Sequence, residues 1–251
     1  IDTRKIIEVT PEHLGSGVVI HPQNEFTGAL EALAKSGAVV QADPNSVASV
    51  IFEKLEGASI VRAMDPCSMP KACKNKVEIN GMKNCHIRDA VAVCNFLSWL
   101  DREVKAGTIL DEGILSNKLD AYRAKLDLFK GISFGTISAA GENAAMCHYN
   151  HNNNEVPGNL VMNSVYLVDS GGQYLDGTTD ITRTVTVGQP SDFMQKTFTL
   201  VLKGHIALGS AKFPEGITGQ HLDTLARQFL WHNGFDFDHG TGHGVGSYLN
   251  V

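Results

Sequence analysis

The chain has 251 residues, of which 43% are hydrophobic and 19% charged. This composition suffices for one large or two smaller folded domains and excludes a largely disordered protein. The formal net charge is −6 and no long basic run is present. A nucleic acid or an anionic membrane surface is therefore disfavoured as a partner, and no apolar run approaches the ~18 residues of a membrane span.

The cysteines are few and irregularly spaced. Their number is odd, and no two of them form a CxxC pair. A disulfide framework or a cysteine zinc site is therefore disfavoured, and a reducing compartment fits better. We accordingly expect a cytoplasmic protein.

The first 62 residues predict an alternation of short strands and helices. Apolar, β-branched runs predict strands at 18–20, 38–40 and 58–63, and a helix is predicted at 46–55 after the turn Asp43-Pro44-Asn45. This αβ alternation is too short for a complete domain. Two Xaa-Pro steps at 65–66 and 69–70 then interrupt the chain and mark a boundary near residue 65.

Helical spacing dominates the next stretch. Apolar residues recur at near-helical intervals between 76 and 104, which predicts a long amphipathic helix, and a second helix is expected at about 110–126.

From about Ile132 the period changes to that of strands. The segments ISFGTIS, VYLVDSG, QYLDGT and DITRTVTVG alternate or are β-branched, as strands of a curved antiparallel sheet are. A polar loop is expected at 150–160, helices at 192–212 and 219–233, and a terminal strand pair in FDFDHGTG and GVGSYLNV. The expected class is α+β, with a curved antiparallel sheet covered by helices.

Two carboxylates flank a turn in DSGGQYLDGTTD. Asp169 ends a buried-looking strand, and Asp180 follows the turn Asp176-Gly177 among strand-forming threonines. A hairpin with this turn brings Asp169 and Asp180 side by side, where two carboxylates repel unless a cation lies between them. Oxygen ligands with an imidazole suit Mn²⁺, Co²⁺ or Zn²⁺. The competing interpretation is that these are turn and cap aspartates, and for Asp176 that interpretation is preferred.

A glycine-rich cluster, HGTGHGVG, carries His239 and His243. The glycines argue against a helical zinc motif, but they let the backbone approach a ligand closely. A phosphate-binding loop is disfavoured because the glycines do not follow GxGxxG and no helix is expected after them. A third candidate is His148, which ends an apolar stretch just before the polar loop. Each histidine, taken alone, is more often a structural residue.

Together these segments resemble the pita-bread metallopeptidases, and within them the Xaa-Pro aminopeptidases. The resemblance rests on VYLVDSGGQYLDGTTDITRT, VLKGHIAL, HGTGHGVGSYLNV and the His148-Tyr149 pair. It is strongest from about residue 83 to 251. It implies that residues 66–251 form part of a pita-bread catalytic domain. Residues 1–65 would then be the C-terminal part of a non-catalytic middle domain.

The resemblance also implies roles for the site residues. Asp169 would bind one metal ion, Asp180 would bridge two, and His243 would bind the second. His148 and His239 would be catalytic or substrate-binding residues. Family members usually carry two Mn²⁺ ions and release an N-terminal residue that precedes proline, so the expected partners are peptides beginning Xaa-Pro. A homodimer is expected for the full-length form.

The chain departs from the family pattern at its end. The family has a further His and two Glu ligands beyond the second cluster, whereas this sequence stops at Val251. We therefore expect the chain alone to bind metal weakly and to be inactive. Two rivals stay open: a catalytically inert pita-bread binding protein, and a prolidase-type dipeptidase. The compact methionine aminopeptidases are disfavoured by the N-terminal remnant.

Overall fold

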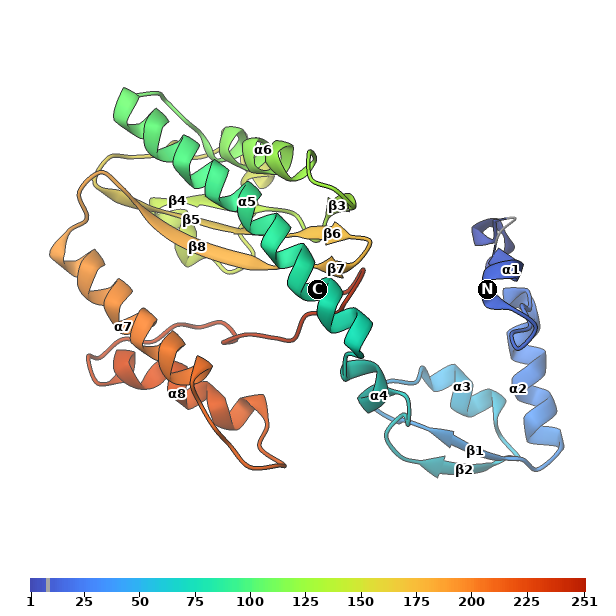
Figure 1. Cartoon of the computed structure of the whole chain (residues 1–251). Helices are drawn as coiled ribbons and strands as arrows, with labels where there is room; N and C mark the ends of the chain where they lie inside the picture. Colours follow the sequence, from blue (N-terminus) through green and yellow to red (C-terminus); the bar gives the residue numbers. More distant parts are fainter. Residues whose placement is uncertain (8–9) are drawn as a thin grey trace. The chain divides into compact units, whose positions relative to one another are not determined.

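The computed structural model describes residues 1–7 and 10–251, which form two compact units, Ile1–Cys73 and Lys74–Val251 (Figure 1). In the part of the chain described, no helix is both long and apolar enough to cross a membrane. The elements of the first unit are α1 (Thr10–Leu14), α2 (Phe26–Lys35), β1 (Val39–Ala42), α3 (Ser49–Lys54), β2 (Ser59–Arg62) and α4 (Ser68–Ala72), with 3₁₀ turns at Thr3–Lys5 and Gln23–Glu25.

The first unit is a small αβ arrangement around one strand pair. Strands β1 and β2 are parallel, with Val39 opposite Ser59. Two of the three predicted strands are present, but the strand predicted at 18–20 is wrong. Val18 and Val19 are exposed and irregular there, because no neighbouring strand supplies hydrogen bonds in the described residues. Helix α2 was not expected from the sequence.

The second unit contains mixed helices and antiparallel strands, which confirms the α+β class. Its elements are α5 (Lys76–Ala106), α6 (Glu112–Arg123), β3 (Phe129–Ile132), β4 (Ile137–Ala140), β5 (Ser164–Ser170), β6 (Gly172–Tyr174), β7 (Gly177–Thr178), β8 (Ile181–Val187), α7 (Asp192–Gly209) and α8 (Gly219–Trp231), with 3₁₀ turns at Gly141–Ala145 and His151–Asn153. The strands form two three-stranded antiparallel sheets, ordered β3-β6-β7 and β4-β5-β8.

Helix α5 has well-defined ends. The Asn75 side chain accepts hydrogen bonds from the first-turn amides, and the Asn75 amide donates to the Glu78 carboxylate, so both halves of a capping box are present. Gly107 ends the helix in the left-handed conformation that glycine adopts without strain. These caps set the helix at 76–106, close to the predicted 76–104.

The hydrophobic core lies between α5, α6 and the sheet β4-β5-β8. Phe96 of α5, Leu115 of α6 and Tyr166 of β5 have no exposed surface. A buried ion pair crosses the two helices: Arg123 donates from Nε and Nη2 to Asp89, at 2.7 and 3.0 Å. The ion pair joins α5 to α6, and the hydrophobic core packs both helices on the sheet that carries the candidate site residues.

The predicted terminal strand pair is wrong, because residues 233–251 form no strand or helix. The segment runs from α8 back toward α5 and β7 (Figure 1) and is held at single points. Lys74 Nζ donates to the Val245 carbonyl at 2.5 Å, and the Leu249 amide donates to the Gln173 side chain at 3.0 Å. No strand in the described residues pairs with this segment, so it forms no β-ladder despite its alternating glycines.

Candidate metal centre

Strand pairing brings the two candidate carboxylates to the same end of one sheet. In the β5–β8 ladder Asp169 lies opposite Thr182, and Ser170 lies opposite Ile181, so Asp180 precedes the ladder by one residue. The intervening chain reverses direction at residues 175–176, between β6 and β7. It then passes close to Gly171, where a Cβ atom would overlap the Thr179 carbonyl oxygen, so glycine is required for this close approach.

Asp169 lies in an environment that disfavours its negative charge. Burial is the main cause that raises the pKa of Asp169, and the nearby Asp180 charge raises it further, while Thr182 acts in the opposite direction. Among the described residues, its buried Oδ1 has no hydrogen-bond partner. A buried acceptor without a partner beside a second carboxylate is the arrangement that a bound cation stabilises.

His243 approaches the same pair. Its Nε2 lies 3.4 Å from Oδ2 of Asp180, and its Nδ1 lies 2.9 Å from the Gly244 carbonyl oxygen. The imidazole is 59% exposed, whereas the Asp180 side chain is only 16% exposed. The structure thus brings Asp180 together with both other predicted metal ligands. Nevertheless, no group of three or more His, Cys, Asp or Glu in the described residues has a metal-binding arrangement.

The donor chemistry of these three residues fits divalent metal ions. Two carboxylates and one imidazole are suitable ligands for Mn²⁺, Co²⁺ or Zn²⁺. The Oδ1 atom of Asp169, which no described residue contacts through a hydrogen bond, would gain a partner from such an ion. The residues present therefore fit part of a metal centre.

His239 is held by α8 rather than by the carboxylate pair. Arg227 of α8 donates to the carbonyl oxygens of Phe237 and His239, at 2.6 and 2.8 Å, and pairs with Asp223 one turn earlier. The His239 ring stacks on Phe237 with centroids 4.7 Å apart. Sequence reasoning did not identify Arg227 as an anchor, although the i,i+4 spacing from Asp223 was a usable signal.

His148 lies in a different place. Its side chain is exposed, its backbone is left-handed with φ of 56°, and it lines a polar cavity of about 530 Å³ with Asp120 and His151. None of Asp169, Asp180 and His243 lines that cavity. Among the described residues, the side chains of His148 and His239 do not contact each other. Neither of these described side chains contacts Asp169 or Asp180.

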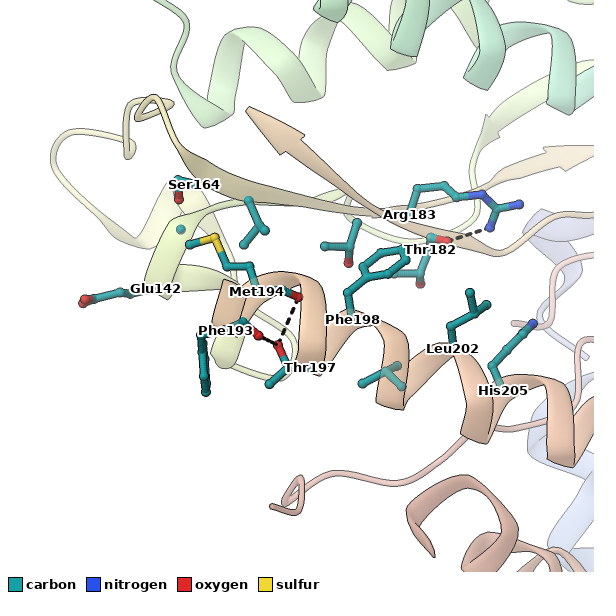
Figure 2. Close-up of a pocket in the computed structure, with 14 residues that line it drawn as sticks. Glu142, Ser164, Thr182, Arg183, Phe193, Met194, Thr197, Phe198, Leu202 and His205 are labelled. Atoms are coloured by element: carbon teal, nitrogen blue, oxygen red, sulfur yellow. Dashed lines mark hydrogen bonds between the residues drawn. The ribbon is translucent and has the colours of Figure 1, made fainter. Parts of the chain in front are cut away.

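An apolar cavity of about 900 Å³ separates α7 from the sheet, and Figure 2 shows its lining. Phe198 and Leu202 extend from α7 toward the strand that carries Thr182 and Arg183 (Figure 2). Thr182 also faces Asp169, so the apolar cavity adjoins the carboxylate pair. Sequence reasoning did not anticipate this cavity.

Comparison with known proteins gives two family matches. Residues 80–251 match the model of metallopeptidase family M24, and residues 1–78 match the creatinase/prolidase N-terminal domain. The curated "Probable Xaa-Pro aminopeptidase P" of Tuber melanosporum is 44% identical over 269 residues, which cover 100% of this chain and 43% of the relative. The protein of that name from Aspergillus fumigatus is 44% identical over 260 residues, covering 100% and 40%.

Comparison with solved structures also finds Xaa-Pro aminopeptidases. The X-prolyl aminopeptidase of Caenorhabditis elegans, described as a cytosolic enzyme with a di-nuclear active site, matches with a TM-score of 0.94 and 41% identity, over 100% of this chain and 42% of that one. The X-Pro aminopeptidase of Thermotoga maritima, at 24% identity and a TM-score of 0.64 over 89% and 62% of the two chains, shares the fold. This chain spans about two fifths of the curated relatives' length. The chain belongs to metallopeptidase family M24, as the resemblance in its sequence predicts.

Proposed function

We propose that this chain is part of a metal-dependent aminopeptidase that releases the N-terminal residue from peptides with proline in second position. Its similarity to Xaa-Pro aminopeptidases over the whole chain supports this reaction. The observation that carries the proposal is the buried Oδ1 of Asp169, which has no partner among the described residues and lies beside Asp180, with His243 Nε2 3.4 Å from that second carboxylate. We further propose that residues 1–65 belong to a non-catalytic domain and 66–251 to the catalytic one.

Asp169, Asp180 and His243 would hold the metal ions, with Asp180 between the other two. Two divalent ions held there, which we expect to be Mn²⁺, would supply a nucleophilic water at neutral pH and would stabilise negative charge on the peptide carbonyl oxygen. Asp169, Asp180 and His243 would fix the position of that charge. His148 and His239 would bind and orient the substrate, the second through its anchored position beside Arg227.

A calorimetric Mn²⁺ titration tests the metal centre. We expect the 251-residue chain to bind Mn²⁺ weakly, because three ligands supply few donors for two ions. Asp180→Asn should abolish the binding heat, since the variant lacks the carboxylate that lies near both Asp169 and His243. The control Asp176→Asn changes a carboxylate that pairs with Arg88 and should leave the titration unchanged. Equal Mn²⁺ binding by the Asp180 variant would contradict the assignment.

A substrate comparison tests the activity. The protein that carries this chain should cleave Xaa-Pro peptides of three or more residues when loaded with Mn²⁺, whereas a prolidase-type enzyme should cleave only Xaa-Pro dipeptides. Cleavage of neither class would favour the alternative of an inert pita-bread binding protein. A cytoplasmic location and a homodimer complete the proposal.

A further inference from the structure

One buried carboxylate outside the candidate metal centre gathers four hydrogen-bond donors. Glu112, the first residue of α6, has no exposed surface. Its Oε1 accepts from the Ala140 amide and from Asn143 Nδ2, both at 2.8 Å. Its Oε2 accepts from the Tyr149 hydroxyl at 2.7 Å and from the Gly158 amide at 2.8 Å. Each oxygen therefore has two donors, which matches a carboxylate and no neutral side chain of the same shape.

The donors come from the beginning, middle and end of one loop. The segment 140–158 leaves β4 at Ala140, passes Tyr149 and returns to α6 at Gly158, whose carbonyl oxygen accepts from the Glu112 amide at 2.9 Å. A Cβ atom on Gly158 would lie 3.0 Å from Glu112 Oε1, so a side chain there would crowd the carboxylate. A single side chain thus ties three distant points of the loop together.

The loop carries His148 directly before one of these tie points. Burial and the Glu112 contact raise the pKa of Tyr149 to about 12, so its hydroxyl stays a donor at neutral pH. Two amide side chains also donate to the Tyr149 hydroxyl, from Asn143 at 3.0 Å and Asn154 at 2.7 Å. His148 itself is exposed and left-handed, and its ring has no hydrogen bond to another described residue. Its position is therefore set through the backbone, by its anchored neighbour.

We infer that Glu112 is a positioning residue for His148: it holds the loop 140–158, through Tyr149, in the conformation that presents the imidazole to substrate. This inference rests on the substrate-binding role proposed above for His148. A residue held in the left-handed region persists only where its surroundings fix it, and the four bonds to Glu112 supply that constraint. The carboxylate itself acts through the loop and contacts no substrate.

The variants Glu112→Gln and Tyr149→Phe separate positioning from general stability. Glu112→Gln places an NH₂ group against two donors, and Tyr149→Phe removes only the hydroxyl beside His148. The matched control is Tyr166→Phe, which deletes another fully buried tyrosine hydroxyl whose partner is Ser138 at 2.7 Å. That hydroxyl makes no hydrogen bond to the loop.

Two readouts decide the inference. In the 251-residue chain, amide exchange at residues 140–158 should accelerate about 10-fold or more in Glu112→Gln, and the His148 ring resonances should shift or broaden. Tyr166→Phe should change neither. In the Mn²⁺-loaded protein that carries this chain, kcat/KM for an Xaa-Pro tripeptide should fall about 10- to 100-fold in Glu112→Gln, and less in Tyr149→Phe.

The outcomes are distinguishable. Unchanged loop exchange and His148 resonances in Glu112→Gln would overturn the inference, whatever the activity. A loosened loop with unchanged kcat/KM would limit Glu112 to a structural role, which also overturns it. A wild-type protein that cleaves no Xaa-Pro peptide would refute the proposed function, and the exchange and resonance changes would still decide whether Glu112 positions His148.

Discussion

Replacing Arg123 with methionine should strongly destabilise the second unit. Arg123 is fully buried and donates two hydrogen bonds to Asp89, which also accepts one from the Tyr174 hydroxyl at 2.6 Å. Removing the guanidinium leaves the Asp89 carboxylate buried with the tyrosine as its remaining partner. Breaking a buried ion pair by removing one member costs about 3–5 kcal/mol.

Replacing both members should cost less than replacing one. In Asp89→Leu/Arg123→Met both charges of this buried pair are removed, and so is the Nη1 atom of Arg123, which is buried without a partner among described residues. The remaining penalty is the Tyr174 hydroxyl without its acceptor, about 1–3 kcal/mol. The double variant should therefore lie between the wild type and the single variant.

Urea unfolding followed by tryptophan fluorescence measures this order. Both tryptophans, Trp99 and Trp231, lie in the second unit. With an m-value of about 3 kcal/mol/M, the single variant should lower the midpoint by about 1–1.7 M. The control Asp101→Asn breaks an exposed ion pair to Lys105 on the same helix and should leave the midpoint unchanged. A double variant as unstable as the single one would refute the reasoning.

Three further predictions concern packing, pH and thiol reactivity. Gly204→Ala should destabilise the second unit, because the added Cβ atom would overlap the Ala226 carbonyl oxygen where α7 meets α8. The control Gly209→Ala, on the same helix, places its Cβ atom in open space and should be neutral or slightly stabilising. Thermal unfolding of the two variants compares their stabilities. Burial raises the pKa of Asp120 above its usual 3.8, so its charged form costs stability at neutral pH. Asp120→Asn should therefore raise the urea midpoint at pH 7. This increase in the midpoint should become smaller as the pH falls through the raised pKa of Asp120 and should vanish below pH 3.8. An increase at pH 3 as large as the one at pH 7 would contradict this prediction. Burial raises the pKa of Cys85 to about 11, so iodoacetamide at pH 8 should label the four exposed cysteines in the native chain and all five only after denaturation, as counted by mass spectrometry.

Much of the fold could be predicted from apolar spacing. The long helices have clear amphipathic periods and local end signals such as Asn75 and Gly107, so the sequence specifies them locally. The strand prediction failed at 18–20, 235–242 and 244–251, because a strand depends on a partner that spacing alone does not reveal. The glycines from 240 to 246 alternate as a strand would, yet this segment is held by isolated contacts.

The candidate site divides in the same way. Asp169 and Asp180 could be proposed as a pair because a carboxylate that ends an apolar strand conflicts with its surroundings, and in the structure Asp169 is half-buried with its Oδ1 atom fully covered. Glu112 could not, because an acidic residue in the first turn of a helix is common. Its importance comes from four donors spread over residues 140–158, a convergence that exists only in three dimensions.

The β5–β8 ladder makes the relative position of Asp169 and Asp180 a matter of strand register. Seven consecutive residue pairs fix Asp169 opposite Thr182, and side chains alternate between the faces of a sheet. A slip of one residue in this ladder would displace Asp180 from Asp169 without altering either residue. The register of the ladder is therefore as much a requirement of the proposed site as the identity of its ligands, and designs that keep both aspartates but shift that register should lose metal affinity.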